Sequence, residues 1–206
     1  MAETRKGVSA KFIKMEKRYR TIFLTAVLLL TGLYFFPLWS IELGAPQFPE
    51  GLGFRIWLDK ITGFNENDLN SINGLNHYIG MQAIQPDSIP ELKYMPYIVG
   101  AMIFLGLISF LINKKPVYLS WLILMTIVLI AGLVDFYIWE YNYGHNLNPM
   151  AAIKIPGTSF QPPLIGSKQI LNMRAVSLPD IGGILVFVST IMIIYTLIKS
   201  RKQKNA

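Results

Sequence analysis

The two histidines of this chain, each followed closely by a methionine, are the residues best suited to bind a metal. His77 and Met81 are four residues apart in "NHYIGM", so a helical turn would place both side chains on one face. His145 and Met150 are five residues apart in "HNLNPM", where a loop would have to bring them together. Because thioether favours Cu(I) and imidazole accepts either oxidation state of copper, these pairs predict a copper site.

The chain contains no cysteine, which excludes disulfides, thiolate metal sites and CxxC redox chemistry. A metal would therefore depend on imidazole, thioether, carboxylate or backbone ligands. A simpler interpretation of each residue stays open. A lone histidine in a loop rich in Gly and Asn is more often a hydrogen-bonding or packing residue, and a methionine among apolar residues is more often packing.

One carboxylate, Asp135, lies inside an apolar run near its outer end. Ionisable residues inside membrane-spanning segments are costly and often functional. Asp135 is predicted to be a structural acid or an acid that supports the metal ligands, and pairing with Arg174 or Lys154, metal ligation and a position facing a polar crevice are the alternatives. A helix–helix hydrogen bond is an equal alternative. Glu140, just beyond the end of this run and on roughly the same helical face, is expected to be solvated.

Four apolar runs are each near or above the length that crosses a bilayer: 21–41, 95–112, 117–139 and 181–198. A helix of about 20 residues spans the hydrocarbon layer. No small-residue cleavage site follows the first run, so it is expected to be a retained anchor. The sequence therefore predicts an all-α membrane protein with four transmembrane helices.

Basic residues predict how this protein is oriented. Thirteen of the 19 Lys and Arg residues lie in a leader, 1–20, a turn, 113–116, and a tail, 199–206. Lys and Arg near the ends of spans mark the cytoplasmic side. Both termini are therefore predicted to be cytoplasmic in a bacterial inner membrane, with 42–94 and 140–180 facing the periplasm. The net charge of +7 is accordingly assigned to orientation and to membrane lipid, not to nucleic acid.

The two long outer loops are expected to form an ordered, loop-rich extracytoplasmic cap. Pro and Gly recur in 140–180 too often for long regular elements, yet this segment also carries apolar side chains that a solvated linker would not need. In 42–94, "FRIWLDKI" is typical of a short strand or an interfacial helix. "NENDLNSING" predicts a short helix over 65–74, capped by Asn65 and Gly74.

Motifs of known enzyme classes are missing from the sequence. It has no Ser nucleophile elbow, no HExxH and no Gly-rich phosphate loop. The cytoplasmic segments are too short for a nucleotide-binding domain. We therefore expect no enzymatic activity and no catalytic residues, and a membrane enzyme or transporter that uses Asp135 is the weaker alternative.

Three stretches resemble a known family: "FPLWSIELGAPQFPEGLGFRIW", "ITGFNENDLNSINGLNHYIGM" and "YGHNLNPMAAIKIPGTSFQPPLIGSKQILN…SLPDIGG". In them the chain is similar to small four-span membrane proteins found with nitrous-oxide reductase and its copper-maturation factors, often beside a NosL-type lipoprotein copper chaperone. The resemblance covers 36–183. It implies an accessory role in copper-enzyme maturation, with that chaperone or reductase assembly proteins as partners, and it identifies no ligands.

Residues and resemblance together predict a copper-handling accessory protein of denitrification. Its cap would hold or relay copper through His77, Met81, His145 and Met150. The alternative is a metal-free structural protein whose apolar, Pro-rich cap docks periplasmic assembly factors. The distance between the two histidine segments in the fold bears on this choice.

Overall fold

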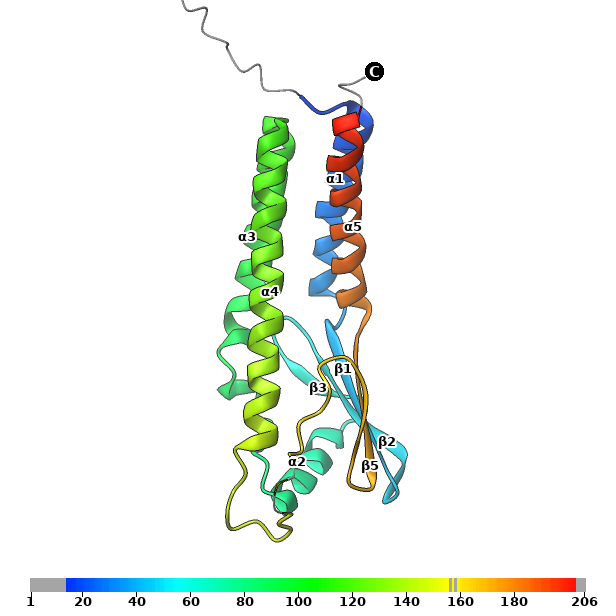
Figure 1. Ribbon diagram of the computed structural model, residues 1–206, viewed down its shortest axis with the longest axis vertical. Coiled ribbons are helices and arrows are strands. Elements are labelled where there is room, and N and C mark those ends of the chain that lie inside the picture. Colours follow the sequence, from blue (N-terminus) through cyan, green and yellow to red (C-terminus); the bar gives the residue numbers. More distant parts are fainter. Residues whose placement is uncertain (1–13, 156, 158, 203–206) are drawn as a thin grey trace, which may run out of the picture.

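The computed structural model describes residues 14–155, 157 and 159–202 (Figure 1). A bundle of helices occupies one end, and a β-sheet with a short helix occupies the other. The expected all-α fold is therefore wrong, because the outer segments contain strands. The elements are α1 (Lys17–Leu29), η1 (Leu30–Tyr34), β1 (Trp39–Ala45), β2 (Phe48–Ile56), β3 (Ile61–Gly63), α2 (Asp68–Ile79), η2 (Pro86–Ser88), α3 (Glu91–Ile112), α4 (Lys115–His145), β4 (Gly166–Ile170), β5 (Met173–Pro179) and α5 (Ile181–Lys202).

Three helices in the described part of the chain, α3, α4 and α5, are long and apolar enough to cross a membrane. They overlap the last three apolar runs of the sequence. The first run is different, since α1 has only 13 residues and continues as the five-residue η1. The end of that run, 39–41, belongs to β1.

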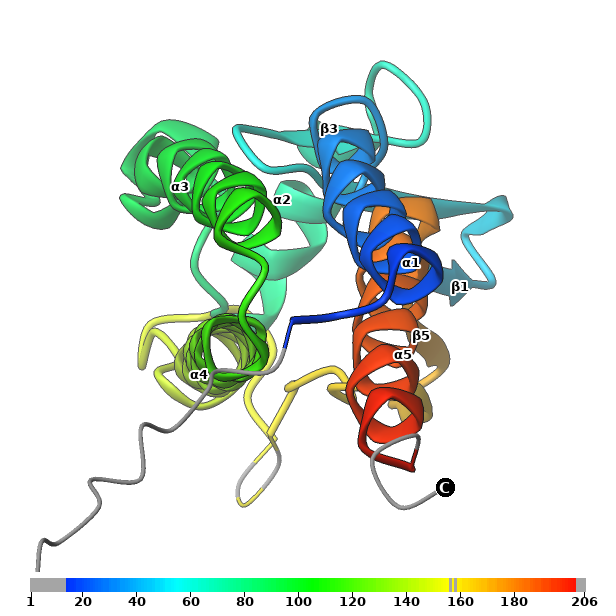
Figure 2. The same ribbon diagram turned by 90° about the horizontal axis from the view of Figure 1, so that it is seen from above.

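Aromatic packing joins α1 to the other helices of the bundle. The Phe23 side chain is fully buried, and its ring meets those of Tyr118 at 4.4 Å and Trp121 at 5.4 Å, both edge to face. On the other side of α1, the Ser189 hydroxyl of α5 donates to the Ala26 carbonyl at 2.8 Å. Figure 2 shows α1 beside α5, and these two helices also contact α3 and α4.

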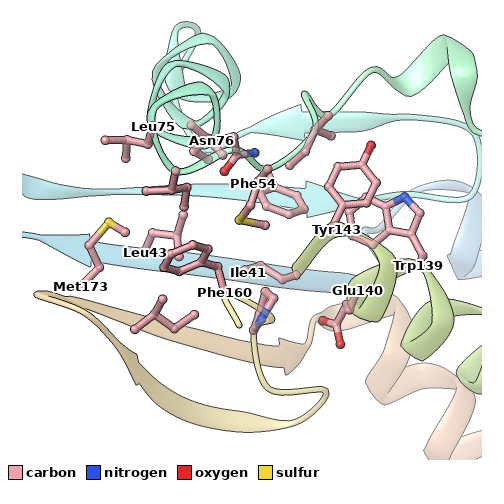
Figure 3. Close-up of a pocket in the computed structure, with 16 residues that line it drawn as sticks. Ile41, Leu43, Phe54, Leu75, Asn76, Trp139, Glu140, Tyr143, Phe160 and Met173 are labelled. Atoms are coloured by element: carbon pink, nitrogen blue, oxygen red, sulfur yellow. The ribbon is translucent and has the colours of Figure 1, made fainter. Parts of the chain in front are cut away.

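Five antiparallel strands form one sheet in the order β3-β2-β1-β5-β4. The central strand, β1, pairs Ile41 with Phe54 of β2 and with Ser177 of β5, which lies far along the sequence. Alternate residues of β1 are buried, as a half-buried strand requires. Ile41 and Phe54 face α2 and the end of α4, so this covered face forms the second apolar core (Figure 3).

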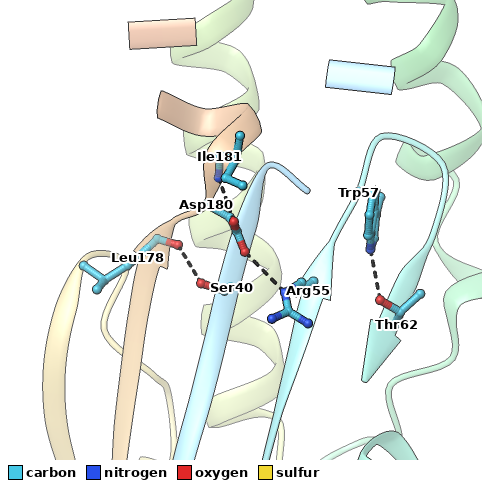
Figure 4. A network of polar contacts seen from close by, with 7 residues as sticks. All are labelled: Ser40, Arg55, Trp57, Thr62, Leu178, Asp180 and Ile181. Carbon is cyan, nitrogen blue, oxygen red and sulfur yellow. Dashed lines mark hydrogen bonds and ion pairs between the residues drawn. The ribbon is translucent and has the colours of Figure 1, made fainter. Parts of the chain in front are cut away.

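Polar contacts fix the junction between the sheet and α5 (Figure 4). The Asp180 carboxylate accepts a hydrogen bond from the Ile181 backbone at 2.7 Å and lies 3.5 Å from the Arg55 guanidinium. The Gly182 N–H donates to the Pro37 carbonyl at 2.8 Å. A Cβ at Gly182 would lie only 2.8 Å from that same oxygen, so the close approach of the two chains requires glycine.

Asp68 fastens the start of α2 to the sheet. Its carboxylate is buried and accepts hydrogen bonds from the backbone of Asn65 at 3.1 Å and of Gly53 at 3.3 Å. The helix ends at Gly80, whose φ of 82° is the left-handed conformation that favours glycine. The expected end at Gly74 is therefore wrong, since Gly74 lies within the helix and a Cβ there would meet open space.

Candidate functional site

A small pocket lies between the covered face of the sheet, α2 and the C-terminal end of α4 (Figure 3). Its volume is about 50 Å³. Aliphatic, aromatic and thioether side chains form most of its wall. They include Phe54, Leu75, Met81, Trp139, Phe160 and Met173.

Glu140 is the acid in this pocket. Its side chain is 0% exposed, and neither carboxylate oxygen has a hydrogen-bond partner among the described residues. The expectation that Glu140 is solvated is therefore wrong. Its neighbours on α4, Phe136, Trp139 and Tyr143, pack against the core of the sheet and so turn this part of the helix inward. Burial without a partner is unfavourable for a carboxyl group, above all in its charged form.

Other polar groups of the pocket use their donors elsewhere. The Asn76 amide donates to the Gln82 carbonyl at 3.2 Å, and the Tyr143 hydroxyl donates to the Ala83 carbonyl at 3.1 Å. Neither bond reaches Glu140. Within the described chain, the residues that line the pocket include no Lys, Arg or His. The acid is therefore not matched by a basic side chain of the lining.

The segment 159–164 passes over the end of α4 and closes one side of the pocket. The Phe160 N–H donates to the Gly144 carbonyl at 3.0 Å. A Cβ at Gly144 would collide with the backbone of Gln161. Gly144 lies one helical turn after Glu140. It permits the close approach of the two segments that places Phe160 against the pocket.

The first predicted pair is divided by the end of α2. His77 lies in the last helical turn and is exposed, whereas Met81 follows the left-handed Gly80 and is half-buried in the wall of the pocket. Met81 therefore does not share a helical face with His77, although the four-residue spacing predicted that it would. The reason is that Gly80 ends the helix before the turn is complete.

In the second pair, the imidazole of His145 is held in a defined orientation. His145 is the last residue of α4, and its ring stacks on Tyr141 at 3.9 Å with an interplanar angle of 16°. Nδ1 lies 3.0 Å from the Tyr141 carbonyl, which can only accept, so Nδ1 donates the hydrogen. In the neutral ring, Nε2 then carries the lone pair that binds a metal. The other member of the pair, Met150, follows α4 and is 83% exposed.

The backbones that carry the two pairs meet. The Asn148 N–H donates to the Gly80 carbonyl at 2.7 Å, and the Ile153 N–H donates to the Tyr78 carbonyl at 2.9 Å. We call these two segments, 77–81 and 145–155, the distal tip, because they lie at the end of the molecule away from the helical bundle (Figure 1). Over the described ranges, no three His, Asp or Glu side chains are grouped to hold a metal, so a site here would depend on thioethers.

Asp135 does not lie in the pocket. It is exposed on α4, and Arg174, one of its expected partners, instead donates to the Ser167 hydroxyl at 3.4 Å. The supporting role predicted for Asp135 stays a prediction.

No family model, curated protein or solved structure matches this chain. The resemblance to the four-span proteins of nitrous-oxide reductase clusters therefore stays a prediction.

Sequence reasoning missed Glu140 as a site residue. Phe136, Trp139 and Tyr143 surround it at helical spacing, and an apolar face of this kind indicates burial. Met173 was also missed, although Met173, Ala175 and Ser177 are all buried at the alternate positions of a strand.

Proposed function

We propose that this chain is a non-enzymatic membrane accessory protein that binds or relays copper outside the cytoplasm, for a periplasmic copper enzyme such as nitrous-oxide reductase. One observation carries the proposal: the two histidine segments meet at the distal tip. They are more than sixty residues apart in the sequence. Imidazole and thioether are the ligands that this tip offers, and they suit Cu(I).

The orientation of His145 also supports this proposal. Histidines that bind metals almost always donate their second ring N–H to a carboxylate, carbonyl or water, which fixes the ring and its tautomer. His145 has this arrangement through the Tyr141 carbonyl. His77 and Met150 are exposed and accessible to a copper donor, and Met81 belongs both to the distal tip and to the wall of the pocket.

Cu(I) binding by the purified full-length protein tests the proposed site. We expect near-stoichiometric binding against a competing chromogenic chelator, and its loss in the double variant His77→Ala/His145→Ala. Met150→Leu should weaken binding, because it removes a thioether and keeps an apolar side chain. Met192→Leu, within the helical bundle, is the matched control and should bind as the unaltered protein does. Unchanged affinity in the double variant would eliminate this site.

We further propose that α1 and η1 together form a fourth span, and that both termini lie in the cytoplasm of a bacterium. With 13 residues at about 1.5 Å each and five at about 2.0 Å each, the two elements reach roughly the 30 Å thickness of the hydrocarbon layer. The basic leader and tail support this orientation. The sheet and the distal tip would then face the periplasm.

Cysteine labelling tests the orientation, because the chain has no cysteine of its own. Gln47→Cys, in the turn between β1 and β2, and Glu16→Cys, before α1, are both exposed positions. In intact spheroplasts, a membrane-impermeant thiol reagent should label the first variant and should label the second only after lysis. The opposite pattern would place the sheet in the cytoplasm.

A second function, docking without metal, has its own support. The distal tip exposes Tyr78 at 58%, Ile153 at 47% and Met150 at 83%. Exposed apolar side chains in a group are typical of an interaction surface. A NosL-type chaperone or a reductase assembly protein would be the partner. Association with such a partner, in a preparation that binds no Cu(I), would favour docking over copper binding.

A further inference from the structure

We propose that the pocket around Glu140 binds a small organic cation, an alkylammonium ion of up to about four non-hydrogen atoms. This site shares Met81 with the copper site proposed at the distal tip, but its acid, Glu140, is not one of the proposed copper ligands. Its volume of about 50 Å³ sets the size of the ligand. A water-sized group occupies about 10–15 Å³ of such a volume, so three to five groups fit.

A positive charge is what the pocket lacks. Glu140 is fully buried with both oxygens unpartnered, and the described lining offers it no basic side chain. Asn76 and Tyr143 each donate a hydrogen bond to a backbone carbonyl and not to Glu140. Folding has therefore already removed this carboxyl group from water. Burial disfavours its charged form when no cation is bound, and a cation that enters stabilises the carboxylate and gains a preorganised partner.

The remaining wall fits an organic cation better than a metal ion. Calcium requires six to eight oxygen ligands and zinc requires four ligands, whereas the side chains of the pocket supply one carboxylate, one amide, one phenol hydroxyl and thioethers. Figure 3 shows Met173 at the end of the pocket opposite Glu140, so these two do not form one coordination sphere. The aromatic faces of Phe54, Trp139 and Phe160 suit an alkylammonium ion.

The test is a titration of the full-length protein, in nanodiscs of zwitterionic lipid, with ethylammonium followed by ligand-observed NMR. Ethanol has the same number of non-hydrogen atoms without the charge, and tetraethylammonium has the charge but is too large. We expect saturable binding of ethylammonium alone, with a dissociation constant no tighter than about 1 mM for so small a ligand. Glu140→Gln should weaken this binding at least tenfold. Glu42→Gln, an exposed acid on β1, should not change it.

A second variant keeps the test decisive if Glu140→Gln folds poorly. Leu75→Phe retains the acid and fills part of the pocket, so it should also weaken binding. The proposal is overturned by absence of saturation in the unaltered protein, by equal affinity in Glu140→Gln, or by displacement of ethylammonium by Cu(I). His77→Ala/His145→Ala should bind ethylammonium normally, so failure of the copper site leaves this result unaffected.

Discussion

We expect Glu140→Met to unfold at a higher temperature than the unaltered protein. The carboxyl group is fully buried and has no hydrogen-bond partner among the described residues. An unsatisfied buried polar group destabilises a fold by about 1–3 kcal/mol, and more when it is charged. Methionine has a similar length, favours helix and suits the apolar wall, so the substitution should recover this free energy.

The midpoint of thermal unfolding in detergent, followed by tryptophan fluorescence, measures this effect. For a chain of about 200 residues, each kcal/mol corresponds to roughly 2–4 °C. Glu42→Met, at an exposed position of β1, is the control and should stay within about 0.5 kcal/mol of the unaltered protein. A lower midpoint for Glu140→Met would show that the acid stabilises the fold.

The variant Gly144→Ala should lose stability by about 1–3 kcal/mol, the range typical of overpacking in a close contact. A methyl group there would collide with the backbone of Gln161, and a main chain cannot move aside as a flexible side chain can. The segment that holds Phe160 against the pocket would be displaced. We therefore also expect Phe160 and Trp139 to become more accessible to solvent, which red-shifts tryptophan emission.

A second glycine of the same helix provides the control for Gly144. A Cβ at Gly132 would have no other atom within 4 Å. Because alanine favours helix over glycine by about 1 kcal/mol, Gly132→Ala should be neutral or slightly stabilising. An equal loss of stability in Gly144→Ala and Gly132→Ala would point to a general effect of alanine in α4 and not to the contact with Gln161.

The membrane-length helices were predictable because the signal is local. Uninterrupted apolar runs contain the information for α3, α4 and α5, and no distant contact is needed to recognise them. The first run was extended too far. Its last residues alternate Trp39 and Ile41 with Ser40, a pattern of period two that belongs to β1 and was hidden by the apolar residues before it.

The sheet was not predictable from local pattern. β2 contains Pro49, Gly51 and Gly53, which are typical of loops, and β4 is mostly polar. β1 gains its partner β5 from a segment more than 130 residues away, so the pairing of Ile41 with Ser177 leaves no local trace. The cap was expected to be ordered but loop-rich, and this expectation underestimated how much of it forms strands.

The copper ligands expected from the sequence stay a prediction. The sequence identified the two histidine segments, and the structure brings their backbones together through the bonds to Gly80 and Tyr78. The sequence did not show whether α2 ends at Gly74 or at Gly80, because both glycines fit a helix terminus and only packing distinguishes them. The placement of His77 and Met81 depended on that choice. The burial of Glu140 depended on the sheet, which the sequence did not reveal.

X-ray absorption at the copper edge of the Cu(I)-loaded protein tests the proposed copper site most directly. We expect scattering from both imidazole nitrogen and thioether sulfur, with a smaller imidazole contribution in each of the single variants His77→Ala and His145→Ala. Copper bound with only sulfur and oxygen neighbours, or spectra of both single variants identical to that of the unaltered protein, would contradict a copper site at the distal tip.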